Sequence, residues 1–245
     1  VYKRQLPLCR RVPRIVGGRV APSLFSPAGG RRECAGCEAS YVQYMSIVGG
    51  MVLAAGLSER MEGELPKQLL PVGGMTLAAL AVRHAEVSRL DRVVVVTGYR
   101  SAEVIAGVAG GRAETVENPD FRQGNMTSFR VGARSLEECD AVVVLLADMP
   151  GITPEMIDRL IDEWEQTHPW AAVSSYHGQI AHPLLLSADA IRQAAEAEGA
   201  KGVWRFLQAV DPDRLRRIEF DRAAPLDVNT TADYDLVAGE FPASG

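Results

Sequence analysis

Residues 51–70 read Met-Val-Leu-Ala-Ala-Gly-Leu-Ser-Glu-Arg-Met-Glu-Gly-Glu-Leu-Pro-Lys-Gln-Leu-Leu, and this stretch decides how the rest of the chain is interpreted. An apolar run over residues 48–55 is typical of a buried strand. The run breaks at Gly56 into a loop that carries Ser58, Arg60 and Lys67. Backbone N–H groups of such a turn can point at an anion, and Arg and Lys offset the remaining negative charge. The stretch therefore indicates a phosphate-binding loop, and the alternative is an ordinary strand and loop with surface charges.

The loop matches neither of two common nucleotide-binding motifs. A Walker A loop would continue with Gly-Lys-Ser or Gly-Lys-Thr, which does not follow Gly56. The dinucleotide fingerprint Gly-x-Gly-x-x-Gly is also missing from this stretch of sequence. A phosphate-binding function here would therefore require a different kind of loop.

The spacing of the fixed residues in this stretch resembles the signature of the MobA-like nucleotidyltransferase family. Its closest resemblance is to the branch of molybdenum cofactor cytidylyltransferases (MocA-like). The resemblance implies that the nucleotide contacts Leu53, Ala54, Ala55, Gly56, Ser58, Arg60 and Lys67. It also implies that Arg60 and Lys67 are catalytic. One departure is that Glu62 stands before Gly63, where the family usually has Arg-Met-Gly.

Composition limits the classes of protein that fit the chain. It has 245 residues, of which 47% are hydrophobic, enough for a sizeable core. The net charge of −5 argues against a nucleic-acid-binding protein. No apolar run approaches about 18 residues, so we expect no membrane-spanning helix. The expected location is the cytoplasm.

Residues 1–44 differ from the remainder of the chain. They carry eight Lys or Arg and two acidic residues, a net charge of +6, which leaves −11 for residues 45–245. No helical or strand period is sustained here. We expect this segment to be disordered or a non-native leader upstream of Met45, although its arginines leave a transit peptide open. Residues 45–245 are expected to form a single nucleotidyltransferase domain.

Strands and helices alternate along residues 45–245, which is the α/β pattern. The β-branched or apolar runs at 92–97 and 141–147 predict buried strands, and the latter is expected to be central. Predicted helices include residues 76–88, 127–136 and 153–165. The pattern predicts a mostly parallel central sheet with helices on both faces, and the resemblance implies a Rossmann-like (GT-A-type) nucleotidyltransferase fold. Such sheets bind ligands at the carboxyl ends of their strands.

Two oxygen-bearing residues are predicted to hold a metal ion. Asp148 directly follows the strand at 141–147, at the edge where ligands bind. Magnesium takes one or two protein oxygens and completes its octahedron with substrate phosphates. The resemblance implies the same role for Asp148 and a second ligand at Asn229. The alternatives are a helix-entry Asp148, and a purely structural capping box formed by Thr230 and Asp233.

Two further segments carry weaker signals. The resemblance implies that Asn118, Gly124 and Ser128 contribute to the nucleotide pocket, although without it the segment would be interpreted as a simple turn before a helix. Asn125 separates Gly124 from Met126, a departure from the family pattern. His182 matches part of a motif at the acceptor side, although a lone histidine before a strand is usually structural.

Together these residues fit one reaction class, magnesium-dependent nucleotidyl transfer with release of pyrophosphate. The resemblance implies CTP as the favoured nucleoside triphosphate and a phosphorylated small molecule, molybdopterin or molybdenum cofactor, as acceptor. A molybdoenzyme apoprotein is a further expected partner, and nucleic acid and membrane are not. The alternatives are another acceptor, such as a phospholactate or a sugar phosphate, and a non-catalytic protein that escorts the cofactor.

Overall fold

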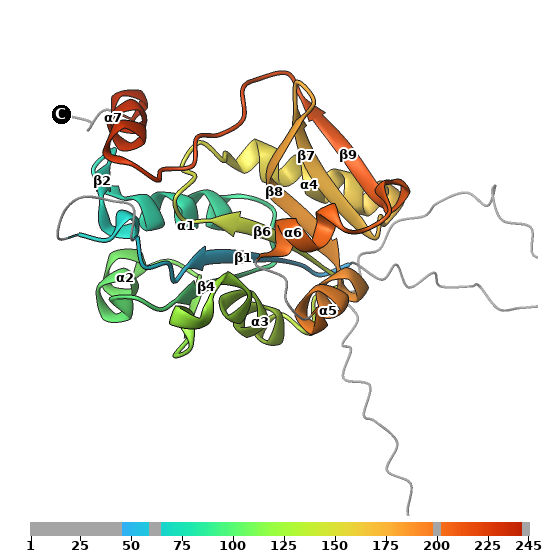
Figure 1. Cartoon of the computed structure of the whole chain (residues 1–245), viewed down its shortest axis with the longest axis horizontal. Coiled ribbons are helices and arrows are strands. Elements are labelled where there is room, and N and C mark those ends of the chain that lie inside the picture. The colour runs from blue at the N-terminus through green and yellow to red at the C-terminus, as the bar shows by residue number, and fades with distance from the viewer. Residues whose placement is uncertain (1–45, 59–64, 198–201, 242–245) are drawn as a thin grey trace, which may run out of the picture. The chain divides into compact units, whose positions relative to one another are not determined.

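The structure, a computed structural model, describes residues 46–58, 65–197 and 202–241. In these ranges a seven-stranded sheet has the strand order β5-β4-β1-β6-β8-β7-β9 (Figure 1). Its strands are β1 (Val48–Ala54), β4 (Arg92–Thr97), β5 (Glu114–Glu117), β6 (Ala141–Leu146), β7 (Ala171–Tyr176), β8 (Gln179–Ser187) and β9 (Leu215–Phe220). A two-stranded antiparallel hairpin pairs β2 (Pro71–Val72) with β3 (Met75–Thr76). The predicted leader, residues 1–44, lies outside the described residues.

The sheet is mostly parallel, as predicted. Strand β1 pairs in parallel with β4 and β6, and β9 pairs in parallel with β7. Only β8 among these strands runs the other way, antiparallel to both β6 and β7. The first residues of β8 therefore lie at the edge where its neighbours β6 and β7 end, which places them close to the predicted ligand-binding edge.

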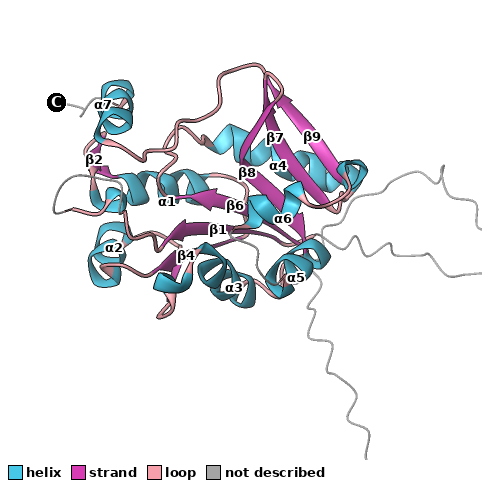
Figure 2. Ribbon diagram, in the orientation of Figure 1, coloured by secondary structure: helices cyan, strands magenta, loops and turns pink. Residues whose placement is uncertain are grey.

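Helices cover both faces of the sheet (Figure 2). One face packs against α1 (Leu77–Val87), α2 (Ser101–Val108) and α4 (Pro154–Thr167). The other face packs against α3 (Asn125–Ser135), α5 (Ala188–Glu196) and α6 (Val203–Gln208). The predicted α/β, Rossmann-like fold is thereby confirmed.

The two-residue period of the buried strands explains this two-sided packing. In β4, Val93 and Val95 belong to the core beneath α1 and α4, whereas Val94 and Val96 belong to the core beneath α3 and α5. Successive side chains point to opposite faces, so an unbroken apolar run is what a strand covered on both faces needs. The last helix, α7 (Thr231–Glu240), packs elsewhere, against the β2–β3 hairpin and α1, where Val237 is buried.

Two local details differ from prediction. Helix α3 begins at Asn125, two residues before the predicted start. Thr153 occupies the position before α4 and Pro154 the first helical position, but the Thr153 hydroxyl makes no capping hydrogen bond to the backbone. The fixed backbone angle of proline therefore starts α4 without a capping hydrogen bond from the Thr153 side chain.

Candidate active site

A cavity of about 530 Å³ lies at the carboxyl ends of β1 and β6. We call it the first cavity. It is lined by Leu53, Ala55, Gly56, Leu57, Ser58, Lys67, Gln68, Phe121, Arg122, Gly124, Asn125, Ser128, Leu146, Ala147, Asp148, Asp227 and Asn229. Parallel strands end together at this edge, which is where the sequence predicts a ligand.

The loop after β1 is fastened to the short helix η1 (Lys67–Leu69). Ser58 has a positive φ of 59°, and its hydroxyl accepts a hydrogen bond from the Lys67 backbone N–H at 2.9 Å. The same hydroxyl donates to Gln68 Oε1 at 3.1 Å, and Gln68 Nε2 donates to the Gly56 carbonyl at 2.9 Å. Gln68 is buried. These contacts set the position from which the Lys67 side chain enters the cavity.

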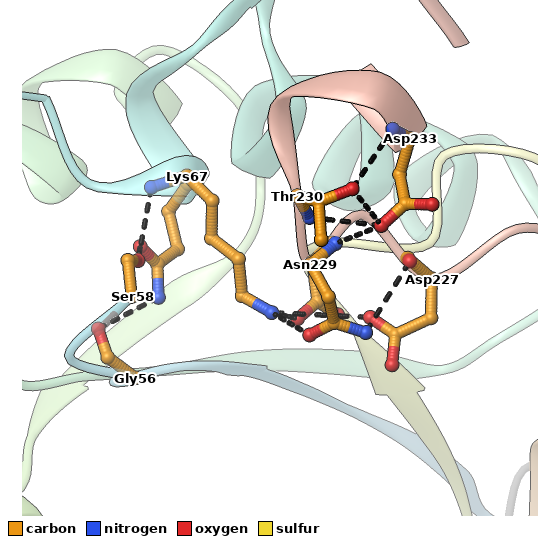
Figure 3. A network of polar contacts seen from close by, with 9 residues as sticks. Gly56, Ser58, Lys67, Asp227, Asn229, Thr230 and Asp233 are labelled. Carbon is orange, nitrogen blue, oxygen red and sulfur yellow. Dashed lines mark hydrogen bonds and ion pairs between the residues drawn. The ribbon is translucent and has the colours of Figure 1, made fainter. Parts of the chain in front are cut away.

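The Lys67 ammonium group lies among oxygens from two distant parts of the chain (Figure 3). It forms an ion pair with Asp148 Oδ2 and donates a hydrogen bond to Asn229 Oδ1 at 3.1 Å. It also lies 3.8 Å from Asp227 Oδ1. The structure thus brings together Lys67, Asp148 and Asn229, three residues singled out from the sequence, and adds Asp227.

Burial shapes the electrostatics of this cluster. The Asp148 side chain is 17% exposed, and burial raises the pKa of its carboxyl, while the adjacent Lys67 ammonium works in the opposite direction. The Asp148 Oδ1 and Asp227 Oδ1 atoms are buried without a hydrogen-bond partner. Unpartnered buried carboxylate oxygens carry a desolvation cost that a cation would relieve.

The donor set fits a hard divalent cation. Two carboxylates and one amide oxygen converge here, and no cluster of three or more His, Cys, Asp or Glu side chains suited to a metal occurs within the described ranges. Magnesium commonly takes only one or two protein carboxylates and keeps positions for phosphate oxygens or water. The cluster therefore suits a metal that is shared with a phosphate-bearing ligand.

Asn229 is held by the start of α7. The Asn229 backbone N–H donates to Asp233 Oδ2 at 3.1 Å, and Thr230 and Asp233 form the predicted capping box. The Val228 backbone N–H donates to the Asp148 carbonyl at 3.0 Å. This bond joins the segment before α7 to the end of β6. The capping box at the start of α7 and the hydrogen bond from Lys67 to Asn229 therefore occur in the same structure.

The segment before α3 and the first turns of α3 form another part of the wall of the first cavity. Gly124 has a φ of 114°, which favours glycine, and both Gly124 and Ser128 line the cavity. Asn118 is buried and does not line it. Its amide donates to Thr127 Oγ1 at 2.8 Å and to Ser128 Oγ at 2.9 Å. The structure thus places Asn118 behind the wall, where it positions Ser128.

A second cavity, of about 560 Å³, shares Leu146 and Asp227 with the first. It is lined by Leu146, Met149, Gln179, Ile180, Ala181, His182, Leu184, Trp204, Ala223, Ala224, Pro225, Leu226 and Asp227. Most of these side chains are apolar, and no Lys or Arg occurs among them. His182 Nε2 is buried without a hydrogen-bond partner, and burial lowers the pKa of the imidazole to about 4, which keeps it neutral at pH 7.

The remaining predicted residues divide into three groups. Leu53, Ala55 and Gly56 line the first cavity, whereas Ala54 is buried in the sheet core. Arg60 lies outside the described residues. Asp227, Gln68, Arg122 and Trp204 also line the cavities but were not predicted as site residues. Asp227 stands two residues before Asn229, and that spacing is the signal that could have identified it.

Comparisons with known proteins identify sequences similar to this chain. The family described as "MobA-like NTP transferase domain" matches residues 50–216. The purine catabolism protein PucB of Bacillus subtilis (strain 168) is 30% identical over 200 residues, which are 77% of this chain and 94% of that protein.

Two solved structures are similar over most of the chain. The Mycobacterium tuberculosis Rv0371c homologue from Mycobacterium sp. strain JC1 has 32% identity and a TM-score of 0.68, covering 79% of this chain and 96% of its own. Rv0371c of Mycobacterium tuberculosis H37Rv in complex with manganese has 28% identity and a TM-score of 0.67, covering 79% of this chain and 99% of its own. That homologue therefore binds a divalent metal.

Proposed function

Because the chain belongs to the family of MobA-like NTP transferase domains and is a nucleotidyltransferase, we propose that it transfers a cytidylyl group from CTP to a phosphate of a molybdopterin-type acceptor. Pyrophosphate is the second product. The cytoplasm is the expected location, and a molybdoenzyme apoprotein is the expected recipient of the product.

One observation carries this proposal: the first and second cavities meet at Asp227. Its carboxylate lies at the junction, 3.8 Å from the Lys67 ammonium that pairs with Asp148. A group transfer between two bound molecules needs their reacting atoms side by side at such a junction. In this arrangement the first cavity takes the nucleotide and the second takes the body of the acceptor.

The residues of the first cavity suit the triphosphate. The loop at Gly56 and Ser58 presents its backbone to the phosphates, and Lys67 offsets their negative charge. The resemblance implies the same function for Arg60, which lies outside the described residues. Magnesium, held by Asp148, Asn229 and Asp227, would stabilise negative charge that develops on the α-phosphate and on the leaving pyrophosphate. Gly124 and Ser128, with Asn118 behind them, form the wall facing the nucleoside.

The chemical step forms one bond and breaks one. An oxygen of the acceptor phosphate attacks the α-phosphorus, and the bond from that phosphorus to the oxygen leading to the β-phosphate breaks. The attacking oxygen is already anionic, so the step requires no strong general base. Catalysis then depends on positioning and electrostatic stabilisation.

The preference for CTP rests on the form of the loop. Leu53-Ala-Ala-Gly56 resembles the cytidylyl branch, whereas the guanylyl branch tends to have Leu-Ala-Gly-Gly. The choice of nucleotide is therefore drawn from the sequence resemblance.

The lining of the second cavity suits an acceptor whose body is flat and uncharged. Trp204, Met149 and Ile180 offer apolar surface on which a ring can pack, and His182 is the neutral polar group among them. A sugar phosphate would require more hydrogen-bonding side chains in this lining. The alternatives remain a phospholactate or sugar phosphate acceptor, and a non-catalytic escort of finished cofactor.

The test is a pyrophosphate-release assay on the full chain with magnesium and each of the four ribonucleoside triphosphates. Each nucleotide is offered with molybdopterin, with a phospholactate and with sugar phosphates. We expect release with CTP and molybdopterin. Release with GTP would overturn the choice of base, and release with another acceptor would overturn the choice of acceptor. Nucleotide binding without any release would favour the escort function.

A further inference from the structure

The Lys67 ammonium occupies the place where the three oxygen-bearing side chains converge (Figure 3). It pairs with Asp148 Oδ2, donates a hydrogen bond to Asn229 Oδ1 at 3.1 Å and lies 3.8 Å from Asp227 Oδ1. These are the side chains assigned above to a divalent cation. We infer that Lys67 is a built-in counter-ion that holds the cation position until metal and nucleotide arrive together, so that the metal alone binds weakly.

The Lys67 ammonium group and a divalent cation cannot bind the same oxygens at the same time. An ammonium group and a divalent cation repel each other strongly at contact distance in a buried site. Burial of Asp148 also makes an unpaired carboxylate there costly, so the lysine stays in place when nothing replaces it. A divalent cation must therefore displace the ammonium group, and without a new partner for that group the displacement is unfavourable.

The nucleotide supplies the new partner. The Lys67 backbone is fixed by its hydrogen bond to Ser58 Oγ at 2.9 Å, while its side chain borders a cavity of about 530 Å³. A lysine side chain has four flexible methylene groups, so its ammonium can move to a triphosphate oxygen while the backbone stays in place. The phosphates then hold the lysine and help to hold the metal, so each ligand favours binding of the other.

The inference rests on the proposed function for the identity of its two ligands, a nucleoside triphosphate and a divalent cation. It goes beyond that function because it assigns Lys67 a role before the nucleotide binds. In that role Lys67 is a positioning residue that sets the order and coupling of binding, in addition to contacting the phosphates.

The experiment titrates the full chain with Mn²⁺, read by electron paramagnetic resonance, with and without α,β-methylene-CTP. Three forms are compared: wild type, Lys67→Met and Arg122→Met. Arg122 is the matched control because it lines the same cavity while its guanidinium lies over the Phe121 ring, 5.2 Å from the centroid. Both variants thus remove one positive charge from the first cavity, but only Lys67→Met removes the ammonium that contacts Asp148.

Without nucleotide, we expect Lys67→Met to bind Mn²⁺ more tightly than wild type by on the order of tenfold or more, and Arg122→Met to change little. The nucleotide analogue should then improve Mn²⁺ binding by a smaller factor in Lys67→Met than in wild type. Equal or weaker Mn²⁺ binding by Lys67→Met without nucleotide would overturn the inference. An equal gain in Mn²⁺ affinity in Arg122→Met would overturn it too, because removal of any positive charge from the cavity would then explain the gain.

Lys67→Gln is a second variant that retains a hydrogen-bond donor without the charge, and it should behave as Lys67→Met does. Thermal melting followed by circular dichroism verifies that each variant is folded. If both Lys67 variants unfold, the test is the Mn²⁺ affinity of the wild type with and without the nucleotide analogue. The inference would be overturned if the analogue did not increase that affinity. All these readouts are independent of turnover. The proposed function alone would be overturned if Lys67→Met bound Mn²⁺ more tightly, as expected, but the wild type released no pyrophosphate with any of the acceptors.

Discussion

The first and second cavities have similar volumes, about 530 and 560 Å³, but opposite chemistry. The first holds Lys67, Arg122, Asp148 and Asn229, whereas the second is mainly apolar. Asp227 belongs to both. The chain therefore concentrates charged side chains where phosphates would react, and it places mainly apolar side chains on the surface that would hold the rest of the acceptor.

Chain direction explains the difference. The first cavity is built largely from segments that directly follow parallel strands, as at Gly56 after β1 and Asp148 after β6. The second cavity uses the beginning of the antiparallel strand β8, the short helix α6 and the segment after β9. Because β8 runs in the opposite direction, its first residues add apolar side chains to the edge where the parallel strands end. In a fully parallel sheet, only the loops that follow the strands would lie at this edge.

The largest effect that would test this division is expected at Asp148. Asp148→Ala should lower kcat by on the order of a thousandfold or more, because the buried carboxylate that we propose as a metal ligand is lost. Circular dichroism and thermal melting should show an intact fold. Asp235→Ala, a change at an exposed position of α7, is the matched control and should leave kcat unchanged. An unaffected rate in Asp148→Ala would remove Asp148 from the mechanism and break the assignment of chemistry to the first cavity.

A smaller effect is expected at Trp204 in the second cavity. Trp204→Ala should reduce kcat/KM for the acceptor by on the order of tenfold to a hundredfold, through loss of a ring surface, while the KM for CTP stays constant. Steady-state kinetics with each substrate varied in turn measures the split. Leu236→Ala, at a side chain on α7 that is 66% exposed, is the control for loss of an apolar group. A rise in the KM for CTP instead would show that the two cavities are not divided between substrates as proposed.

The third effect is on stability, not on rate, and concerns His182. Its pKa is lowered by burial from the ordinary value of 6.5 to about 4. Between these pH values the unfolded chain binds a proton that the folded chain does not, so the free energy of unfolding decreases as the pH falls. The full effect is about 3 kcal/mol and is present above pH 6.5.

Urea unfolding at pH 7 and pH 5 measures this change in the free energy of unfolding. His182→Gln has no imidazole to protonate, so its loss of stability between the two pH values should be smaller than that of the wild type. The comparison with wild type cancels the contribution of the carboxylates, which both proteins share. Equal losses would mean that the folded protein accepts a proton at His182, and the second cavity would then carry charge at mildly acidic pH.

Much of the fold could be predicted because its strands are buried on both faces. The apolar runs that form β1, β4 and β6 have no polar interruptions, so their bounds follow from the sequence to within one residue. The hairpin of β2 and β3 was not predicted, because strands of two residues carry no measurable period. Glycines at 73 and 74, both with positive φ, make its turn.

The sequence predicted the main residues of the first cavity but not the wall of the second cavity. Asp148 was predicted because it follows a buried strand, and the carboxyl ends of parallel strands meet at one edge. Lys67 was predicted from its place in the loop after Gly56 and from the family resemblance. The direction of β8 cannot be derived from its composition, so the wall that contains His182 could not be assembled. Trp204 lies on a helix of six residues, too short for a pattern that shows which side faces a cavity.

The ion pair between Lys67 and Asp148 has a consequence for how the chain is made. In the order of synthesis, Lys67 precedes Asp148 by 81 residues, and Asp227 follows Asp148 by 79 residues. At about 5–20 residues per second, a growing chain acquires Asp148 and its lysine several seconds before Asp227 and Asn229. Both charges of the ion pair are therefore already in the chain before the last of the proposed metal ligands is added, and the pairing itself uses none of those later residues.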